Sequence, residues 1–255
     1  MNLGWLAALF FMTAALYASV GFGGGSTYTA LLIMAGTPRL LVPVISLACN
    51  ILVVSGNTTN YWRDGLYKTG KYIPLIILSI PMAWLGGWLN ISETLFIGLL
   101  WVALLLAGLR LLLSKPQTEV TEIRKMPFWQ SAIIGGFIGL YSGLAGIGGG
   151  IFLAPILYFT RWGRAREIAA ACSLFILVNS ISGLAGQLTK LTDLDMLGQV
   201  WTYWPVLPAV LIGGFIGNRF AALKISELWL KRLTAILILS AALRLGFEWV
   251  LLITA

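Results

Sequence analysis

Apolar stretches that approach the thickness of a lipid bilayer recur along the chain and are separated by short polar or charged segments. They cover residues 42–54, 72–89, 94–113, 168–184, 206–222 and 228–253. A helix needs about 20 predominantly apolar residues to cross the hydrocarbon core. The pattern therefore predicts an all-α, polytopic membrane protein. No basic lead precedes the first apolar run, so we expect the chain from Asn2 onward to form a membrane segment and not a cleaved signal peptide.

Two glycine-rich segments interrupt this pattern, one in each half of the chain. Residues 21–26 read GFGGGS, and residues 146–151 read GIGGGI. Glycine is a poor helix former, and a cluster of it leaves backbone amides uncovered. A pair of interrupted membrane helices in corresponding halves is typical of a transporter binding site. The alternative is that these glycines only allow helices to pack closely.

Short matches in the same order in both halves indicate an internal duplication. Besides the glycine segments, SLACN (46–50) resembles AAACS (169–173), PMAWLGGW (81–88) resembles PAVLIGGF (208–215), 91–93 resembles 225–227, and GLRL (108–111) resembles ALRL (242–245). We predict a first repeat over residues 1–113, a linker over 114–127 and a second repeat over 128–255. Each repeat would contain a helical hairpin, over 2–36 and 128–159, followed by three transmembrane helices.

The distribution of Lys and Arg predicts how the chain crosses the membrane. If each glycine segment is the tip of a hairpin that returns to the side it entered from, only Arg39 and Lys190 remain on one face and most other basic residues collect on the opposite face. The positive-inside rule favours this arrangement over two continuous spans, which would divide the basic residues almost evenly. We therefore predict a multi-pass protein of the bacterial cytoplasmic (inner) membrane, with both termini outside and the linker in the cytoplasm.

Corresponding loops carry exchanged charge, which predicts that the two repeats are inverted. Residues 61–71 are basic, whereas their counterpart, residues 190–199, contains Asp193 and Asp195. A hairpin and three spans reverse direction an odd number of times, so the second repeat would start from the opposite side. At about 1.5 Å per residue the short hairpin arms reach only halfway across the bilayer. The two glycine tips are therefore expected to meet near the middle.

Composition excludes several other classes of protein. The chain has 59% apolar and 10% charged residues and contains no histidine, which removes Ser–His and Cys–His triads and histidine metal sites. We expect no enzyme, no metal and no cofactor. Membrane topology accounts for the net charge of +8, so the bilayer and not nucleic acid is the expected partner. Cys49 and Cys172 lie in apolar segments, and we expect them to pack and not to relay sulfur.

The doubled GxGGG segments, the second followed by Ala154 and Pro155, in a duplicated chain of this length resemble the TauE/SafE sulfite exporter family, the toluene sulfonate uptake permease type. The resemblance implies a bacterial carrier of small sulfur-containing anions, of the sulfite, sulfonate, sulfoacetate or thiosulfate class. The first copy departs from the pattern, with Ala30 in place of the proline and with Ser26 and Thr27 after its glycines. This departure bears on the substrate more than on the fold.

The residues also favour an anion on physical grounds. A short helix is expected to begin at Ser26 and another at Ile151, and the first amides of each lack intrahelical partners at the positive end of the helix dipole. Two such ends would form an anion cradle at the membrane midplane. The predicted substrate-binding residues are Gly23, Gly24, Gly25, Ser26, Thr27, Asn50, Asn57, Gly148, Gly149, Gly150, Ser173 and Asn179. For the hydroxyl and amide side chains, the alternative role is hydrogen bonding between helices.

Arg110 and Arg244 occupy equivalent places late in the last span of each repeat. We predict that they attract the anion into a vestibule on each side; alternatively, they only extend to the membrane surface. An anion channel and a membrane assembly factor without transport stay open as other functions. The direction of transport and the presence of a homodimer also stay open.

Overall fold

The computed structural model describes residues 3–113, 123–124, 126–190, 194–219 and 227–254. Within these residues the chain forms helices and no strand, so the all-α prediction is confirmed. The helices are α1 (Leu3–Ser19), α2 (Gly25–Met34), α3 (Leu41–Arg63), a 3-10 turn η1 (Leu66–Thr69), α4 (Ile73–Ile77), α5 (Ser79–Trp88), α6 (Glu93–Leu112), α7 (Phe128–Ala145), α8 (Gly150–Phe159), α9 (Ala165–Leu188), α10 (Leu194–Thr202), α11 (Val206–Arg219) and α12 (Glu227–Thr254).

Each predicted apolar stretch coincides with a helix or, for residues 72–89, with the pair α4 and α5. Among the described residues, α3 and residues Arg166–Leu188 of α9 are long and apolar enough to cross a membrane. The ranges Leu3–Ser19, Ile73–Trp88, Thr94–Arg110, Gly150–Phe159 and Val206–Arg219 are shorter apolar helices. Helix α10 lies where only a charged loop was expected.

Both glycine segments form turns between a long helix and a short one. Helix α2 begins at Gly25 and α8 at Gly150, each one residue earlier than expected. The preceding residues, Gly24 and Gly149, have φ angles of 88° and 80°. Side chains disfavour this left-handed backbone, whereas glycine adopts it readily. The chain can therefore turn sharply and start a new helix at once.

Helices α6 and α12 run antiparallel and interlock through glycine and tryptophan. Gly98 packs on the ring of Trp249, and Gly246 packs on the ring of Trp101, so residue numbers rise along one helix as they fall along the other. The two indole rings stack, with 5.4 Å between their centroids. Each of the two helices thus contributes one glycine and one tryptophan to this contact.

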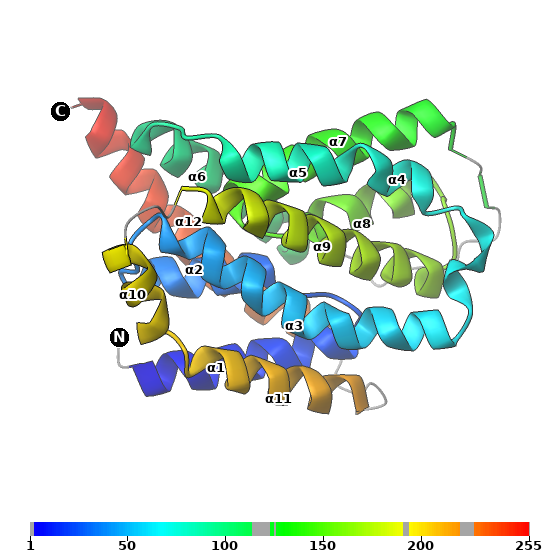
Figure 1. Cartoon of the computed structure of the whole chain (residues 1–255), viewed down its shortest axis with the longest axis horizontal. Coiled ribbons are helices and arrows are strands. Elements are labelled where there is room, and N and C mark those ends of the chain that lie inside the picture. Colours follow the sequence, from blue (N-terminus) through cyan, green and yellow to red (C-terminus); the bar gives the residue numbers. More distant parts are fainter. Residues whose placement is uncertain (1–2, 114–122, 125, 191–193, 220–226, 255) are drawn as a thin grey trace.

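Helices α3 and α9 are also antiparallel, because Thr58 bonds to Ser173 while Gly183 packs on Leu47. The other main contacts join helices that run in the same direction. Helix α11 follows α1 and α3 in parallel, with Gly213 on the Phe11 carbonyl and Gly214 on Val53. Helix α5 follows α7 and α9 in parallel in the same manner, with Gly86 and Gly87 as the close contacts. Helices α1 and α7 therefore run in opposite directions (Figure 1).

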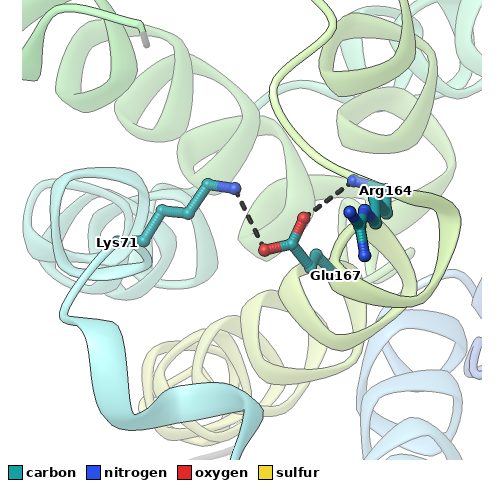
Figure 2. A network of polar contacts seen from close by, with 3 residues as sticks. All are labelled: Lys71, Arg164 and Glu167. Carbon is teal, nitrogen blue, oxygen red and sulfur yellow. Dashed lines mark hydrogen bonds and ion pairs between the residues drawn. The ribbon is translucent and has the colours of Figure 1, made fainter. Parts of the chain in front are cut away.

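Glu167, in the first turn of α9, joins two segments at one end of the molecule through an ion pair and a hydrogen bond. Glu167 accepts a hydrogen bond from Lys71 Nζ at 3.4 Å and from the Arg164 backbone amide at 2.8 Å (Figure 2). The Lys71 ammonium also lies 4.1 Å from the centre of the Trp162 ring. These contacts bring the segment after α3 against the segment between α8 and α9.

Candidate functional site

The two glycine turns meet inside the molecule, where two side chains of α3 hold them. The Ser46 hydroxyl lies 3.1 Å from the Gly25 carbonyl oxygen and 2.7 Å from that of Gly146. Asn50 Nδ2 donates to the Ile147 carbonyl at 3.3 Å. Both side chains are fully buried. The two glycine segments, residues 21–26 and 146–151, are thus joined by side chains that lie one helical turn apart.

Asn50 leaves no room for side chains on the glycines around it. A Cβ atom at Gly23 would lie 2.5 Å from Asn50 Oδ1, and one at Gly148 would lie 2.7 Å from Asn50 Nδ2. A Cβ atom at Gly25 would collide with the Ile147 carbonyl oxygen. The structure therefore brings together five of the predicted glycines, namely Gly23, Gly24, Gly25, Gly148 and Gly149, and Gly150 begins α8 beside them against Ile176.

Where the two turns meet, backbone carbonyl oxygens have hydrogen-bond partners, whereas several backbone amides have none within the described part of the chain. Three turn carbonyls accept bonds from Ser46 and Asn50. The first backbone hydrogen bonds of α2 and α8 are donated by Thr27 and Phe152, the third residue of each helix. Among the described residues, nothing accepts a bond from the amides of Gly25, Ser26, Gly150 and Ile151. The ends of α2 and α8 thus present free donors at the positive end of each helix dipole.

Buried polar atoms without a partner surround the second turn. They are Oδ1 of Asn50, the hydroxyls of Ser142 and Ser180, and both amide atoms of Asn179. A Cβ atom at Gly148 would lie 3.3 Å from Ser180 Oγ, and one at Gly149 would lie 3.4 Å from Ser142 Cβ. Phe175 of α9 packs on Gly149. Asn179 lies one helical turn after Phe175 and on the same face of α9. An unpaired buried polar group costs about 1–3 kcal/mol, so this cluster favours a polar occupant.

Several predicted residues lie apart from the turns or have other partners. Ser173 is buried between α3 and α9, 3.0 Å from Thr58 Oγ1 and 3.4 Å from the Val54 carbonyl oxygen. Thr27 donates to Tyr17 OH at 3.1 Å. Asn57 lies seven residues beyond Asn50 on α3 and lines a pocket at the end of that helix. Ser26 is buried at the start of α2.

The two predicted vestibule arginines lie on the surface. Arg110 is exposed in the last turn of α6. Arg244 is exposed on α12, and its Nη1 donates to the Met34 carbonyl at 3.2 Å. Met34 ends α2, so the guanidinium of Arg244 lies at the negative end of that short helix. This contact gives Arg244 a structural role that the sequence did not indicate.

The predicted substrate-binding residues include neither Ser46 nor Ser142. Ser46 begins the matched segment SLACN one turn before Asn50, which was a usable signal. Ser142 lies in an apolar run, and only the fold places it beside Gly149. Cys49 and Cys172 are free and buried in apolar clusters. Among the described residues there is no group of three or more potential metal ligands.

The chain is similar to a known family and to known membrane proteins. Residues 6–245 match the family model described as sulfite exporter TauE/SafE. A probable membrane transporter protein of Sinorhizobium fredii, y4hK, is 32% identical over 243 residues, which cover 94% of this chain and 96% of that protein. A probable membrane transporter protein of Haemophilus influenzae is 27% identical over 215 residues, which cover 79% of this chain and 78% of that protein. No solved structure matches the chain.

Proposed function

Because this chain belongs to the sulfite exporter TauE/SafE family and is a multi-pass membrane transporter, we propose that it carries small sulfur-containing anions. The family description supports sulfite or a related oxyanion as the substrate. The site between the glycine turns supports an anion on independent physical grounds.

The observation that carries the proposal is that the carbonyl oxygens of the glycine turns are hydrogen-bonded while, in the part of the chain that the structure describes, the first amides of α2 and α8 are not. Ser46 and Asn50 occupy the carbonyl oxygens, which would otherwise repel an anion. Among the described residues, the first amides of α2 and α8 then remain without a hydrogen-bond acceptor. An anion supplies acceptor atoms and gains from both helix dipoles without any buried cation.

The directions of the helices support transport between two faces. Helices α1 and α7 run in opposite directions, so the hairpins approach the site from opposite ends. This is the arrangement expected of inverted repeats that alternate access to a fixed central site. We place the termini outside and residues 114–127 in the cytoplasm of the inner membrane, because the basic loops then face the cytoplasm. Export is the direction that the family description favours.

The substitution Asn50→Leu tests this site. We expect saturable sulfite flux into proteoliposomes to lose about tenfold in apparent affinity, because the Ile147 carbonyl is left unpaired and the two turns lose their common contact. The matched control is Ser55→Ala, since Ser55 lies on the same helix but bonds only to its own Ile51 carbonyl. Unchanged affinity in Asn50→Leu would remove Asn50 from the site. Flux that never saturates, or single-channel currents, would establish a channel instead.

A further inference from the structure

A pocket of about 430 Å³ opens where α1, α3, α9 and α11 come together, away from the contact between the two glycine turns. Most of its lining residues have polar or charged side chains, and they include Asn57, Asn60, Arg63, Asp64, Arg166 and Asn218. The volume exceeds that of a water molecule, about 30 Å³, many times over. A small oxyanion with part of its hydration shell fits within it.

The pocket contains donors without matching acceptors. Asn57 is 3% exposed, and its Nδ2 has no hydrogen-bond partner. Asn218 Nδ2 lies against Gly56 of α3. A second amide group therefore reaches the pocket from the neighbouring helix α11. A buried donor such as Asn57 Nδ2 is costly unless an acceptor reaches it. An acceptor that enters from solution would satisfy it.

The charges in the pocket leave one cation uncompensated. Asp64 Oδ2 lies 2.6 Å from Arg166 Nη2, so these two charges pair with each other. Among the described residues no carboxylate pairs with Arg63, which also lines the pocket. The local field therefore favours an anion and disfavours a cation.

The pocket reaches the first glycine turn. Ala18 and Ser19, which line it, are the last residues of α1 before that turn. Tyr61, a further lining residue, directs its hydroxyl at Gly21, where a Cβ atom would collide with it. A ligand in the pocket thus lies on the outer side of the turn whose inner side contacts Asn50.

At the other end of the molecule the corresponding space is narrow. A pocket of only about 20 Å³ is lined there by Arg39, Leu144, Gln187 and Lys190, among others. Gln187 stands 123 residues after Asp64, the same offset that separates SLACN from AAACS. Gln187 Nε2 donates a hydrogen bond to the Gly143 carbonyl oxygen at 2.7 Å. Among the described residues, the space around Gln187 is thus much smaller than the wide pocket.

We propose that this wide pocket is a second anion-binding site, at which an oxyanion of the sulfonate type docks between Asn57, Asn218 and Arg63 before or after it occupies the central site. The inference rests on the proposed function for the identity of the anion. The docking itself is a local property of the pocket and can be tested without any measurement of transport.

The test uses the purified full-length protein with Cys49 and Cys172 replaced by alanine and with the substitution Asn60→Cys in the pocket. The rate of thiol modification is measured with two methanethiosulfonate reagents, one bearing a sulfonate and one bearing a trimethylammonium group. Adding Arg63→Gln should lower the rate for the anionic reagent on the order of tenfold and should not lower the rate for the cationic one. Sulfoacetate should slow modification in the parent and lose this effect in Arg63→Gln.

The matched control is Arg124→Gln, which removes an exposed cation that does not line the pocket. Equal effects of Arg63→Gln and Arg124→Gln on the anionic reagent would overturn the proposal, as would a lack of protection by sulfoacetate. If the Asn60→Cys protein does not purify as a folded protein, Ser19→Cys reports on the same pocket. Anion-selective labelling in a protein without sulfite flux would reject the proposed function and leave the docking site standing; flux without selective labelling would do the reverse.

Discussion

At Asn50 a single amide group contacts both glycine turns. Its Nδ2 bonds to one turn, while a Cβ atom on Gly23 of the other turn would lie 2.5 Å from its Oδ1. Each turn therefore needs glycine for the backbone it adopts and also for the space that Asn50 occupies. Ser46, one turn earlier on α3, adds bonds to the Gly25 and Gly146 carbonyls. Residues of the first half of the chain thus position the turn of the second half.

The substitution Gly148→Ala violates both requirements, and comparison with a second glycine separates them. The alanine would adopt a φ angle of 81° and place its Cβ atom 2.7 Å from Asn50 Nδ2 and 2.9 Å from Ile176 Cγ2. We expect a loss of stability of more than about 2 kcal/mol, from left-handed backbone strain and from overpacking together, and a loss of sulfite flux. The control is Gly36→Ala, which has a φ angle of 76° and nothing within 4 Å of the added Cβ atom. It should lose only about 1–2 kcal/mol and keep its flux; equal losses in both variants would contradict the role of the Asn50 contact.

Titration of Lys190 is expected to make the stability of the folded protein depend on pH. Burial lowers its pKa from 10.5 to about 8 in the loop that follows α9. Between these values the unfolded chain binds more protons than the folded one, so stability contributed by Lys190 rises with pH from about 8 to 10.5. We expect the melting temperature of the wild type, relative to that of Lys190→Met, to rise over this interval and to stay level below pH 7. A parallel pair of curves would show that the pKa of Lys190 is not lowered.

At the scale of the helices, glycine determines how closely neighbours approach. Gly135, Gly139 and Gly143 recur at every fourth position of α7 and lie on carbonyl oxygens of Leu75, Ser79 and Ala83. Residues four apart share one face of a helix, so these three form a continuous contact surface. Small residues of this kind let helix backbones approach closely in a membrane. The packing role that was the alternative for the GxGGG segments thus applies to these other glycines.

The substitution Gly143→Ala is expected to destabilise the protein by about 1–3 kcal/mol, since its Cβ atom would collide with the Ala83 carbonyl oxygen and displace α5. The substitution Gly198→Ala on α10 should act in the opposite direction, because nothing lies within 4 Å of the added Cβ atom. Alanine in place of glycine inside an exposed helix gains about 0.5–1 kcal/mol. Thermal unfolding of the two purified variants measures the expected loss of stability in Gly143→Ala and the expected gain in Gly198→Ala. A stable Gly143→Ala protein would mean that α5 and α7 are not in contact.

The helices could be predicted because long apolar stretches leave few other structures possible in a membrane. The exception is α10, which begins after Asp193 and contains Asp195, so that its charge indicated a loop. The partners of polar side chains could not be predicted in the same way. Asn50 and Ser173 match in sequence, yet Asn50 binds a glycine turn and Ser173 pairs with Thr58. A sequence match identifies a position in the backbone, whereas the partner depends on which helix from the other half lies opposite.

At the scale of the whole molecule, the two halves exchange equivalent contacts. Helix α1 packs with α11 and α7 packs with α5, so the long arm of each hairpin lies against a helix of the other half. Helices α3 and α9 pack together, as do α6 and α12. In both exchanged contacts one glycine of a matched pair lies on the hairpin arm, Gly213 on α1 and Gly86 on α7, while Gly214 and Gly87 contact α3 and α9. Neither half can bury its helices without the other, so we expect the chain to fold as one unit.

The orientation of this unit in the membrane is tested by cysteine accessibility in bacteria that express the protein without Cys49 and Cys172. Arg39 and Arg164 are both exposed, and they follow the short arms of the first and second hairpins. If the hairpins enter from opposite faces with the basic loops inside, a reagent that cannot cross the inner membrane should label Arg39→Cys in intact cells. It should label Arg164→Cys only after permeabilisation. Gly70→Cys is the control for the inner face, since the Lys71–Glu167 pair holds that loop beside Arg164. Labelling of Gly70→Cys and Arg164→Cys from different sides would be incompatible with that contact and with hairpins that return to the face they entered from.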